Sequence, residues 1–417
     1  MEYGLIGQKL SHSFSKTVHS LIADYSYELK ELNDEELSTF FETRDFKGVN
    51  VTIPYKKSVI KYLDFVSEIA LKIGAVNTVV NNGGKLYGYN TDYYGLKSML
   101  KFYNVDLKGK KVLLLGSGGT SKTAQVLAND LGADSVYVVS RTAGEGVITY
   151  SQAETIHNDA DIIINTTPVG MYPDNYSSVI KLDKFKRLSC VVDVIYNPLK
   201  SKLIVSAENM GIKAYGGLYM LISQAVSSAE KFLSESFSFD ICNDIFCKIM
   251  SCKQNIVLIG MPGSGKTTYG EKLADKLSKS FVDTDIQIEK ALGHTPFDII
   301  EKWGEKYFRK IESDVVLDVS KKQSMVIATG GGVVLDSNNI AALKQNGVIV
   351  FLDRPLEKLN CYNDRPLANT TEKLTKMYNE RYELYKSYCD FSVKVQNFDD
   401  SVLDEIIRRT KIENSCH

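Results

Sequence analysis

Two apolar, strand-length runs of the chain each lead directly into a glycine-rich turn and then into a helical pattern. The first is KKVLLLGSGGTSKTAQVLANDLG, from Lys110, and the second is NIVLIGMPGSGKTTYG, from Asn255. Turns of this kind bring backbone N–H groups close to a phosphate at the N-terminus of a helix. The chain therefore contains two separate beginnings of a nucleotide-binding fold, which favours two functional units.

Short β-rich runs alternate with helix-length amphipathic stretches along the rest of the chain. Further runs of this kind are DSVYVVS, ADIIINT, CVVDVIY, SMVIATG and GVIVFLD. This alternation predicts the α/β class, with parallel sheets covered by helices. At 417 residues the chain also exceeds what one hydrophobic core supports.

A boundary between the two units is indicated after residue 250. Residues 239–250, FDICNDIFCKIM, have the apolar spacing of a helix, and polar SCKQN follows before the strand at Asn255. We therefore expect a short linker at 251–254 and a second unit at 255–417.

The composition excludes several classes of protein. The formal net charge is −1, without a block of five or six basic residues, so a nucleic-acid-binding surface is not expected. The start MEYGLIG lacks the basic segment of a signal peptide, and the apolar runs are too short to span a membrane. Seven scattered cysteines without a CxxC pair argue against disulfides and zinc. These features predict a soluble, cytoplasmic enzyme that acts on small molecules; they do not predict an oligomeric state.

The first glycine turn has the pattern of a dinucleotide site, with Ser121 in place of the third glycine. Arg141 ends the next strand, where a site selective for NAD usually carries an acid, so we expect NADP. Glu145 and the lack of a second basic residue weaken this selectivity, and a solvated surface charge is the alternative role of Arg141. The predicted cofactor contacts are Gly116, Ser117, Gly118, Gly119, Ser140, Arg141 and Thr142.

Four polar motifs precede this turn: SHSFS, GVNVTIPYK, GAVNT and YNTDYYG. With INTTPVGM, DVIYNPL and GGLYMLISQA after it, the segment from Met1 to about Met250 resembles the shikimate dehydrogenase family. The resemblance implies NADPH-dependent reduction of 3-dehydroshikimate to shikimate. It also implies a substrate lobe at 1–100 plus 218–250 and a Rossmann lobe at 101–217. Implied substrate contacts are Ser13, Ser15, Asn50, Thr52, Asn77, Tyr196 and Gln224, with Gly217 beside the nicotinamide.

Lys56 and Asp92 match the catalytic pair of that family. Reduction of a ketone creates an alkoxide, which an ammonium group stabilises and can protonate. Asp92 orients this ammonium group and accepts from a substrate hydroxyl. A lone Lys–Asp pair is structural in most proteins, and the surrounding motifs favour the catalytic interpretation here.

The second glycine turn fits the P-loop pattern GxxxxGK[ST] between a strand and a helix. Lys266 neutralises phosphate oxygens in such loops, and the Thr267 hydroxyl binds Mg²⁺. The predicted ATP contacts are Gly263, Ser264, Gly265, Lys266, Thr267 and Thr268.

Three motifs after this loop, VDTD, GEKYFRKIE and IATGGGVV, narrow the substrate. With them, the segment from Asn255 to about Arg409 resembles the shikimate kinases. The resemblance implies phosphorylation of the 3-hydroxyl of shikimate, with Asp285 as the base, Arg309 and Arg381 on the carboxylate, and Asp283 near Mg²⁺. It further implies that Arg365 in NDRPLA reaches the ATP phosphates, and that the substrate is covered by Gly330, Gly331 and Gly332.

The leading hypothesis is therefore one chain with two consecutive enzymes of chorismate and aromatic amino acid biosynthesis. A quinate/shikimate dehydrogenase with relaxed cofactor choice is an alternative for the first half. A nucleotide-binding regulatory module without catalysis is the other alternative for either half.

Overall fold

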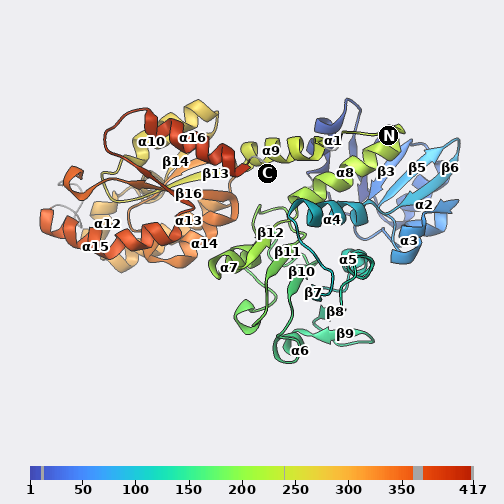
Figure 1. Ribbon diagram of the computed structural model, residues 1–417. Helices are drawn as coiled ribbons and strands as arrows, with labels where there is room; N and C mark the ends of the chain where they lie inside the picture. The colour runs from blue at the N-terminus through green and yellow to red at the C-terminus, as the bar shows by residue number, and fades with distance from the viewer. Residues whose placement is uncertain (11–13, 239, 360–369, 415–417) are drawn as a thin grey trace. The chain divides into compact units, whose positions relative to one another are not determined.

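The computed structural model describes residues 1–10, 14–238, 240–359 and 370–414 (Figure 1). The chain divides into two compact units, Met1–Phe246 and Cys247–His417. Among the described residues, none of the helices combines the length and the apolar character that crossing a membrane requires.

The first unit begins with a six-stranded sheet in the order β2-β1-β3-β5-β6-β4. β1 is parallel to β2 and β3, whereas β5 is antiparallel to β3 and to β6. These antiparallel pairs depart from the predicted parallel arrangement, and the turn between β5 and β6 is a tight hairpin that Gly83 and Gly84, both with positive φ, allow. Its elements are β1 (Tyr3–Gly7), α1 (Ser15–Ile22), β2 (Glu28–Glu31), α2 (Asp34–Thr43), β3 (Gly48–Val51), η1 (Ser58–Tyr62), β4 (Phe65–Val66), α3 (Glu68–Ile73), β5 (Thr78–Asn82) and β6 (Lys85–Tyr89).

The second sheet of this unit is entirely parallel, in the order β12-β11-β10-β7-β8-β9. The strand order reverses between β7 and β10, the point at which doubly wound sheets bind nucleotides. The four strands predicted here are confirmed. The elements are β7 (Lys111–Leu115), α5 (Gly119–Asp130), β8 (Ser135–Ser140), β9 (Val147–Thr149), α6 (Tyr150–Thr155), β10 (Ile162–Asn165), η2 (Leu182–Lys184), β11 (Cys190–Asp193), α7 (Lys202–Asn209) and β12 (Lys213–Tyr215).

Two helices, α4 (Thr91–Phe102) and α8 (Leu218–Leu233), pack against each other in the first unit. Their buried residues Leu96, Met99 and Met220 share one core cluster with Val112 and Leu114 of β7. Gly95 permits the close approach, because a Cβ there would lie 2.7 Å from the carbonyl oxygen of Met220. The start of α4 and the face of α8 are thereby held in fixed register.

The second unit is built on a parallel sheet in the order β14-β15-β13-β16-β17. Alternate residues of β13 enter two core clusters, Val257 and Ile259 one and Ile256 and Leu258 the other, as expected for a strand covered on both faces. The three strands predicted here are confirmed. The strands are β13 (Asn255–Ile259), β14 (Ser280–Asp283), β15 (Met325–Ala328), β16 (Gly347–Asp353) and β17 (Phe391–Lys394).

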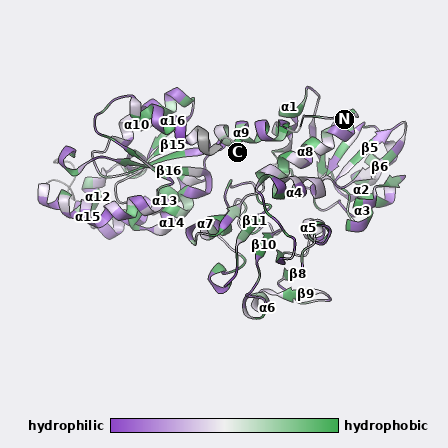
Figure 2. Ribbon diagram, viewed as in Figure 1, coloured by the Kyte–Doolittle hydropathy of each residue, from purple (hydrophilic) through white to green (hydrophobic). Residues whose placement is uncertain are grey.

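Helices cover both faces of this sheet. Figure 2 shows the inner strand β16 as hydrophobic, whereas α15 carries many polar residues. The helices are α10 (Lys266–Leu277), α11 (Thr284–Leu292), α12 (Pro296–Trp303), α13 (Glu305–Ser320), η3 (Val333–Leu335), α14 (Ser337–Asn346), η4 (Leu356–Lys358), α15 (Thr371–Tyr388) and α16 (Ser401–Asn414).

The two units divide within helix α9 (Ile241–Lys253), between Phe246 and Cys247. Residues 251–253, expected as linker, form the last turn of this helix. The Lys279 ammonium donates to the carbonyl oxygens of Ser251 (2.7 Å) and Gln254 (2.9 Å). A lysine thus satisfies carbonyl groups that a helix end leaves unpaired.

Candidate active sites

Lys56 and Asp92 form an ion pair in the first unit. The Lys56 Nζ lies 2.6 Å from Asp92 Oδ2, and the two side chains are 19% and 12% exposed. Lys56 follows β3, and Asp92 lies in the first turn of α4. The predicted pair is therefore brought together in a largely shielded position.

Asn77 holds Asp92 from the other side. Its Nδ2 donates to Asp92 Oδ1 (2.9 Å), and its Oδ1 accepts from the Thr91 N–H (2.7 Å). Each carboxylate oxygen of Asp92 thus has a fixed partner, Lys56 or Asn77. Asn77, expected to contact substrate, also acts as a support for the ion pair.

Asn50 lies in a buried polar cluster behind this pair. Its Oδ1 accepts from the Tyr27 hydroxyl (2.7 Å), and its Nδ2 donates to Ser228 (2.8 Å) and Thr78 (3.0 Å). The Asn50 residue is only 5% exposed. Since its amide is engaged within the protein, the structure favours a supporting role over the expected substrate contact.

The sequence alone did not identify Tyr27, Thr78 and Ser228 as parts of this cluster. Ser228 is 178 residues from Asn50 along the chain, so no local motif joins them. A weaker signal was available: Ser228 lies four residues after Gln224 on α8, the spacing at which two side chains share one face of a helix.

The remaining predicted substrate contacts come from several elements. Ser15 is the first residue of α1, and Thr52 directly follows β3. Gln224 on α8 has its Oε1 3.5 Å from the Thr91 hydroxyl. The Tyr196 ring centroid lies 5.4 Å from that of Phe14, and burial raises the pKa of Tyr196. Ser13 lies outside the described residues.

The glycine turn after β7 fits a dinucleotide phosphate. Gly116 has φ +103°, and a Cβ there would lie 2.9 Å from the Thr167 methyl group. A Cβ at Gly118 or Gly119 would meet no atom within 4 Å, so space lies in front of the N-terminus of α5. The donors of that helix end suit an anionic ligand.

Side chains at the end of β8 lie beside this turn. The Ser140 hydroxyl is 3.5 Å from that of Ser117, and Arg141 and Thr142 follow as exposed residues. Arg141 also contributes positive charge near Tyr150, where it opposes the burial that raises the tyrosine pKa. This places a cation at the edge where the predicted 2′-phosphate contact is needed.

Backbone packing leaves no room for a side chain at Gly217. A Cβ on Gly217 would overlap the carbonyl oxygen of Val194, and the Gly217 N–H donates to Ile195 O (2.8 Å). Position 217 therefore requires a glycine because it contacts the backbone of the 193–199 loop. The expected role, leaving room for a nicotinamide ring, is not needed to explain why a glycine stands there.

Asp193 joins three segments near this loop. Its Oδ1 accepts from Asn165 Nδ2 and from the Ile195 N–H, both at 3.0 Å, and its Oδ2 accepts from the Ser201 hydroxyl (2.5 Å). Burial raises the pKa of Asp193 to about 6, although these hydrogen bonds oppose the shift. The carboxylate therefore ties β10 and α7 to the loop that carries Tyr196.

Asp193→Asn is expected to remove a pH dependence of stability. Because the folded pKa of about 6 exceeds the unfolded value of 3.8, the Asp193 contribution is full below pH 3.8 and is lost as pH rises through 6. From pH 4 to 7 the unfolding free energy of the variant should rise relative to wild type by roughly 2–3 kcal/mol. Denaturant unfolding across this range measures it. Parallel pH profiles for both proteins would contradict it, and the exposed Asp183→Asn is the control.

The second glycine turn forms a P-loop. Gly263 and Gly265 have φ of +82° and +96°, and Gly265 is the N-cap of α10. The Lys266 ammonium donates to the carbonyl oxygens of Gly260 (2.9 Å) and Met261 (3.0 Å). Ser264 is fully buried, and Thr268 follows in the first turn of α10. The lysine is therefore folded over the loop in the position from which it meets phosphate oxygens.

Thr267 and Asp283 fit a magnesium ion. The Thr267 hydroxyl donates to Asp283 Oδ2 (2.7 Å), while Asp283 Oδ1 accepts from the Asp285 N–H (3.0 Å). Mg²⁺ favours one or two protein oxygens together with water and phosphate. Thr267 and Asp283 would supply those protein oxygens, and phosphate and water would complete the coordination. In the described ranges no cluster of three His, Cys, Asp or Glu side chains forms a metal site.

The glycine triplet after β15 gathers the other predicted residues of the second unit. A Cβ on Gly330 would lie 2.7 Å from a carboxylate oxygen of Asp285, and one on Gly332 would overlap Arg309 Nη1. Gly331 O accepts from Arg381 Nη1 (3.1 Å). Asp285, Arg309 and Arg381 therefore converge on Gly330–Gly332, as predicted. Arg365 lies outside the described residues.

Glu312 belongs to the same cluster, although the sequence assigned it no role. Its Oε2 accepts from Arg309 Nη1 (2.8 Å), and its Oε1 would lie 2.7 Å from a Cβ on Gly330. Burial raises the pKa of Glu312, and the neighbouring Arg309 opposes that shift. Its position three residues after Arg309 on α13 was the signal that could have identified it.

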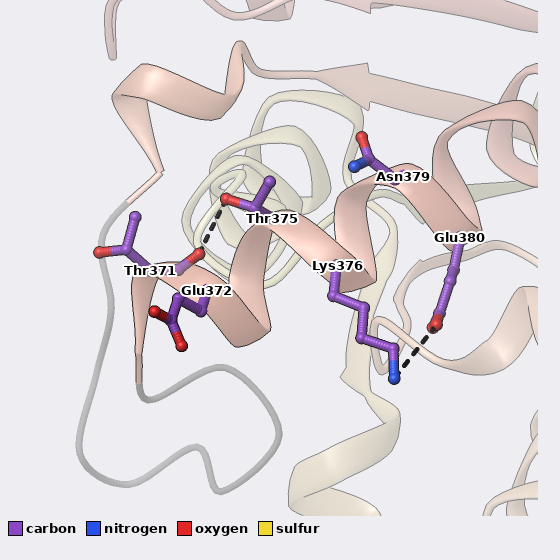
Figure 3. Close-up of a pocket in the computed structure, with 6 residues that line it drawn as sticks. All are labelled: Thr371, Glu372, Thr375, Lys376, Asn379 and Glu380. Carbon is purple, nitrogen blue, oxygen red and sulfur yellow. Dashed lines mark hydrogen bonds and ion pairs between the residues drawn. The ribbon is translucent and has the colours of Figure 1, made fainter.

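A separate hollow of about 640 Å³ lies along one face of α15 (Figure 3). Its lining includes Lys376 and Glu380, which lie 3.9 Å apart, and the Thr375 hydroxyl, which donates to Thr371 O (2.8 Å). No predicted site residue within the described ranges is among its lining residues.

Known families match both units. A family model described as shikimate dehydrogenase substrate binding domain matches residues 5–79, and one described as shikimate kinase matches residues 262–411. A shikimate dehydrogenase (NADP(+)) of Clostridium beijerinckii is 38% identical over 243 residues, which cover 55% of this chain and 90% of that protein.

Solved structures of dehydrogenases match as well. Shikimate dehydrogenase 1 from Peptoclostridium difficile has a TM-score of 0.56 at 38% identity and covers 60% of this chain and 98% of its own. Shikimate 5-dehydrogenase from Thermus thermophilus, in complex with NADP(H) and shikimate, has a TM-score of 0.53 at 28% identity and covers 59% of this chain and 98% of its own. Quinate dehydrogenase from Corynebacterium glutamicum, in complex with NAD, has a TM-score of 0.54 at 26% identity and covers 60% of this chain and 99% of its own.

Proposed function

Because the chain belongs to the shikimate dehydrogenase family in its first unit and carries a shikimate kinase domain in its second, we propose that it catalyses two consecutive reactions on one cyclic hydroxy acid. The first is reduction of 3-dehydroshikimate with NADPH, and the second is phosphorylation of the shikimate 3-hydroxyl by ATP. The observation that carries this proposal is that each unit has its own nucleotide turn and its own cluster of polar side chains.

In the dehydrogenase reaction NADPH supplies the hydride. The Lys56 ammonium donates a hydrogen bond to the substrate oxygen and stabilises the negative charge that develops there. Asp92, 2.6 Å from Lys56 and held by Asn77, keeps the ammonium group oriented toward the substrate oxygen. The low exposure of the pair excludes competing water, which strengthens the electrostatic effect.

In the kinase reaction Asp285 accepts a hydrogen bond from the substrate hydroxyl, while Arg309 and Arg381 hold the substrate carboxylate. Two guanidinium groups fix the orientation of a carboxylate as well as its charge. Lys266, now on the carbonyl oxygens of Gly260 and Met261, would turn to phosphate oxygens, and Thr267 and Asp283 would hold Mg²⁺, which would neutralise phosphate charge. We propose that Arg365 assists at the phosphates.

The proposed functional domains follow the three sheets. We assign residues 1–100 plus 218–250 to the substrate lobe, 101–217 to the NADP lobe and 255–417 to the kinase, with 251–254 between them. The proposed partners are small-molecule substrates, without nucleic acid or membrane. A cytoplasmic location agrees with an odd number of cysteines and the lack of a CxxC pair.

A coupled assay tests the whole proposal. Purified protein is given 3-dehydroshikimate, NADPH and ATP with Mg²⁺, while NADPH loss and ADP release are followed together. We expect ADP release to depend on prior NADPH oxidation and to be restored by added shikimate when NADPH is omitted. ADP release without either shikimate or NADPH would refute the sequence of reactions.

A second candidate for the first unit is a quinate/shikimate dehydrogenase that accepts NAD. The similarity to a quinate dehydrogenase in complex with NAD, and the presence of Glu145 near Arg141, favour testing it. Activity with quinate and NAD that matches activity with shikimate and NADP would support this candidate over the first.

Arg141→Ala is expected to weaken the preference for NADP. The guanidinium pairs with the 2′-phosphate that NAD lacks, and a charge-assisted contact of this kind contributes roughly tenfold in affinity. We expect the KM for NADP to rise about tenfold and the KM for NAD to change less than twofold, as measured by initial rates. Equal changes with both cofactors would contradict the assignment, and the exposed Lys122→Ala on α5 serves as a control.

A further inference from the structure

Arg309 is held by two glutamates of its own helix. Its Nε and Nη2 donate to Glu305 Oε1 (3.2 and 2.9 Å), and its Nη1 donates to Glu312 Oε2 (2.8 Å). Three N–H groups of the guanidinium are thus used by protein carboxylates, although Arg309 is also the proposed ligand of the substrate carboxylate.

The two glutamates differ in exposure. The Glu312 side chain is 1% exposed and cannot leave Arg309 without becoming a buried, unpaired charge, whereas the Glu305 side chain is 44% exposed. Glu305 is also the first residue of α13, where the helix dipole stabilises a carboxylate with or without Arg309. Release of Glu305 into water therefore costs little, as for other exposed ion pairs.

The charge of the cluster favours this release. Asp285, Glu312, Arg309 and Arg381 border Gly330–Gly332, and Glu305 joins them through its ion pair with Arg309, which makes three carboxylates and two guanidinium groups. The formal surplus is one negative charge, so an anionic substrate would be repelled. When Glu305 turns outward, the other four groups are neutral in sum.

Glu305 covers the edge of the Arg309 guanidinium that a substrate carboxylate would need. Its Nη1 contacts Glu312 and lies so close to Gly332 that a Cβ there would overlap it. The Nε–Nη2 edge is the side-on pair of donors that matches a carboxylate, and Glu305 covers it.

We propose that Glu305 is a displaceable stand-in for the substrate carboxylate. It holds Arg309 in position and gives way when the carboxylate of shikimate takes the Nε–Nη2 edge. The proposal rests on the proposed kinase activity. It predicts that removing the negative charge of Glu305 strengthens substrate binding, because competition disappears while Glu312 still orients Arg309.

Glu305→Gln tests this directly in the full-length protein. We expect the KM for shikimate in the ADP-release assay at saturating ATP to fall about two- to fivefold, with kcat changed less than twofold. Calorimetry without ATP, fitted with one shikimate site in each unit, should give the same fall in Kd for the second unit and an unchanged Kd for the first. Shikimate methyl ester, which lacks the carboxylate charge, should bind equally to wild type and variant. An unchanged or higher Kd for shikimate, or the same gain with the ester, would overturn the proposal.

Asp318→Asn is the matched control. It removes one negative charge from an exposed position on the same helix, more than two turns beyond Arg309. We expect the Kd for shikimate to be unchanged in Asp318→Asn. A fall in Kd equal to that of Glu305→Gln would show that any lost negative charge strengthens binding, and would refute the role of Glu305 as a stand-in for the substrate carboxylate. If wild type binds shikimate without phosphorylating it, the proposed kinase activity fails, while the calorimetric comparison still decides the role of Glu305.

Discussion

Lys56→Ala should lower the rate of 3-dehydroshikimate reduction by about 10³-fold and leave shikimate phosphorylation within twofold of wild type. An ammonium group that both stabilises and protonates a developing alkoxide contributes on this scale. The loss should appear in kcat, because the interaction is strongest in the transition state. Separate initial-rate assays of the two reactions on one preparation measure both values.

The neighbouring Lys57 provides the control for this experiment. Lys57 is exposed, whereas Lys56 is bound to Asp92 at 2.6 Å, so Lys57→Ala removes the same charge without touching the pair. We expect Lys57→Ala to keep full reductase activity. A loss of less than tenfold in Lys56→Ala would show that Lys56 is a structural ion-pair residue.

Lys266→Ala should impair phosphorylation and spare reduction, the reverse of Lys56→Ala. We expect kinase activity to fall by at least about 10²-fold, because the lysine neutralises phosphate oxygens whose charge must be stabilised during transfer. Reduction of 3-dehydroshikimate should stay within twofold of wild type. The same paired assays measure both activities, and the retained reductase rate shows that the first unit is folded.

Lys272 on the same helix is the matched control for Lys266. Its side chain is 54% exposed and pairs with Asp400 at 3.1 Å, away from the P-loop carbonyl groups that Lys266 contacts. Lys272→Ala should keep kinase activity. If Lys56→Ala or Lys266→Ala abolished both reactions in a folded protein, independent sites would be wrong, and loss of neither would favour a regulatory role for the unit concerned.

The α/β class, the seven strands predicted from apolar runs and the two nucleotide turns could be derived from the sequence. Each depends on residues that are contiguous in the chain, such as Gly263–Lys266 between β13 and α10. Local patterns of this kind report backbone conformation directly, because a strand, a glycine turn and a helix start are formed by neighbouring residues. The pairing of Lys56 with Asp92 was expected from family motifs, and the structure has it.

Tertiary structure decided which polar side chains face a ligand and which support them. Asn50 and Asn77 stand in motifs associated with substrate, yet their amides bind Tyr27, Ser228 and Asp92. The roles of Glu305 and Asp193 likewise emerged only from their contacts. The physical reason is that each amide or carboxylate has few hydrogen-bonding positions, and the partner that fills them is set by distance in space, which the order of residues along the chain does not specify.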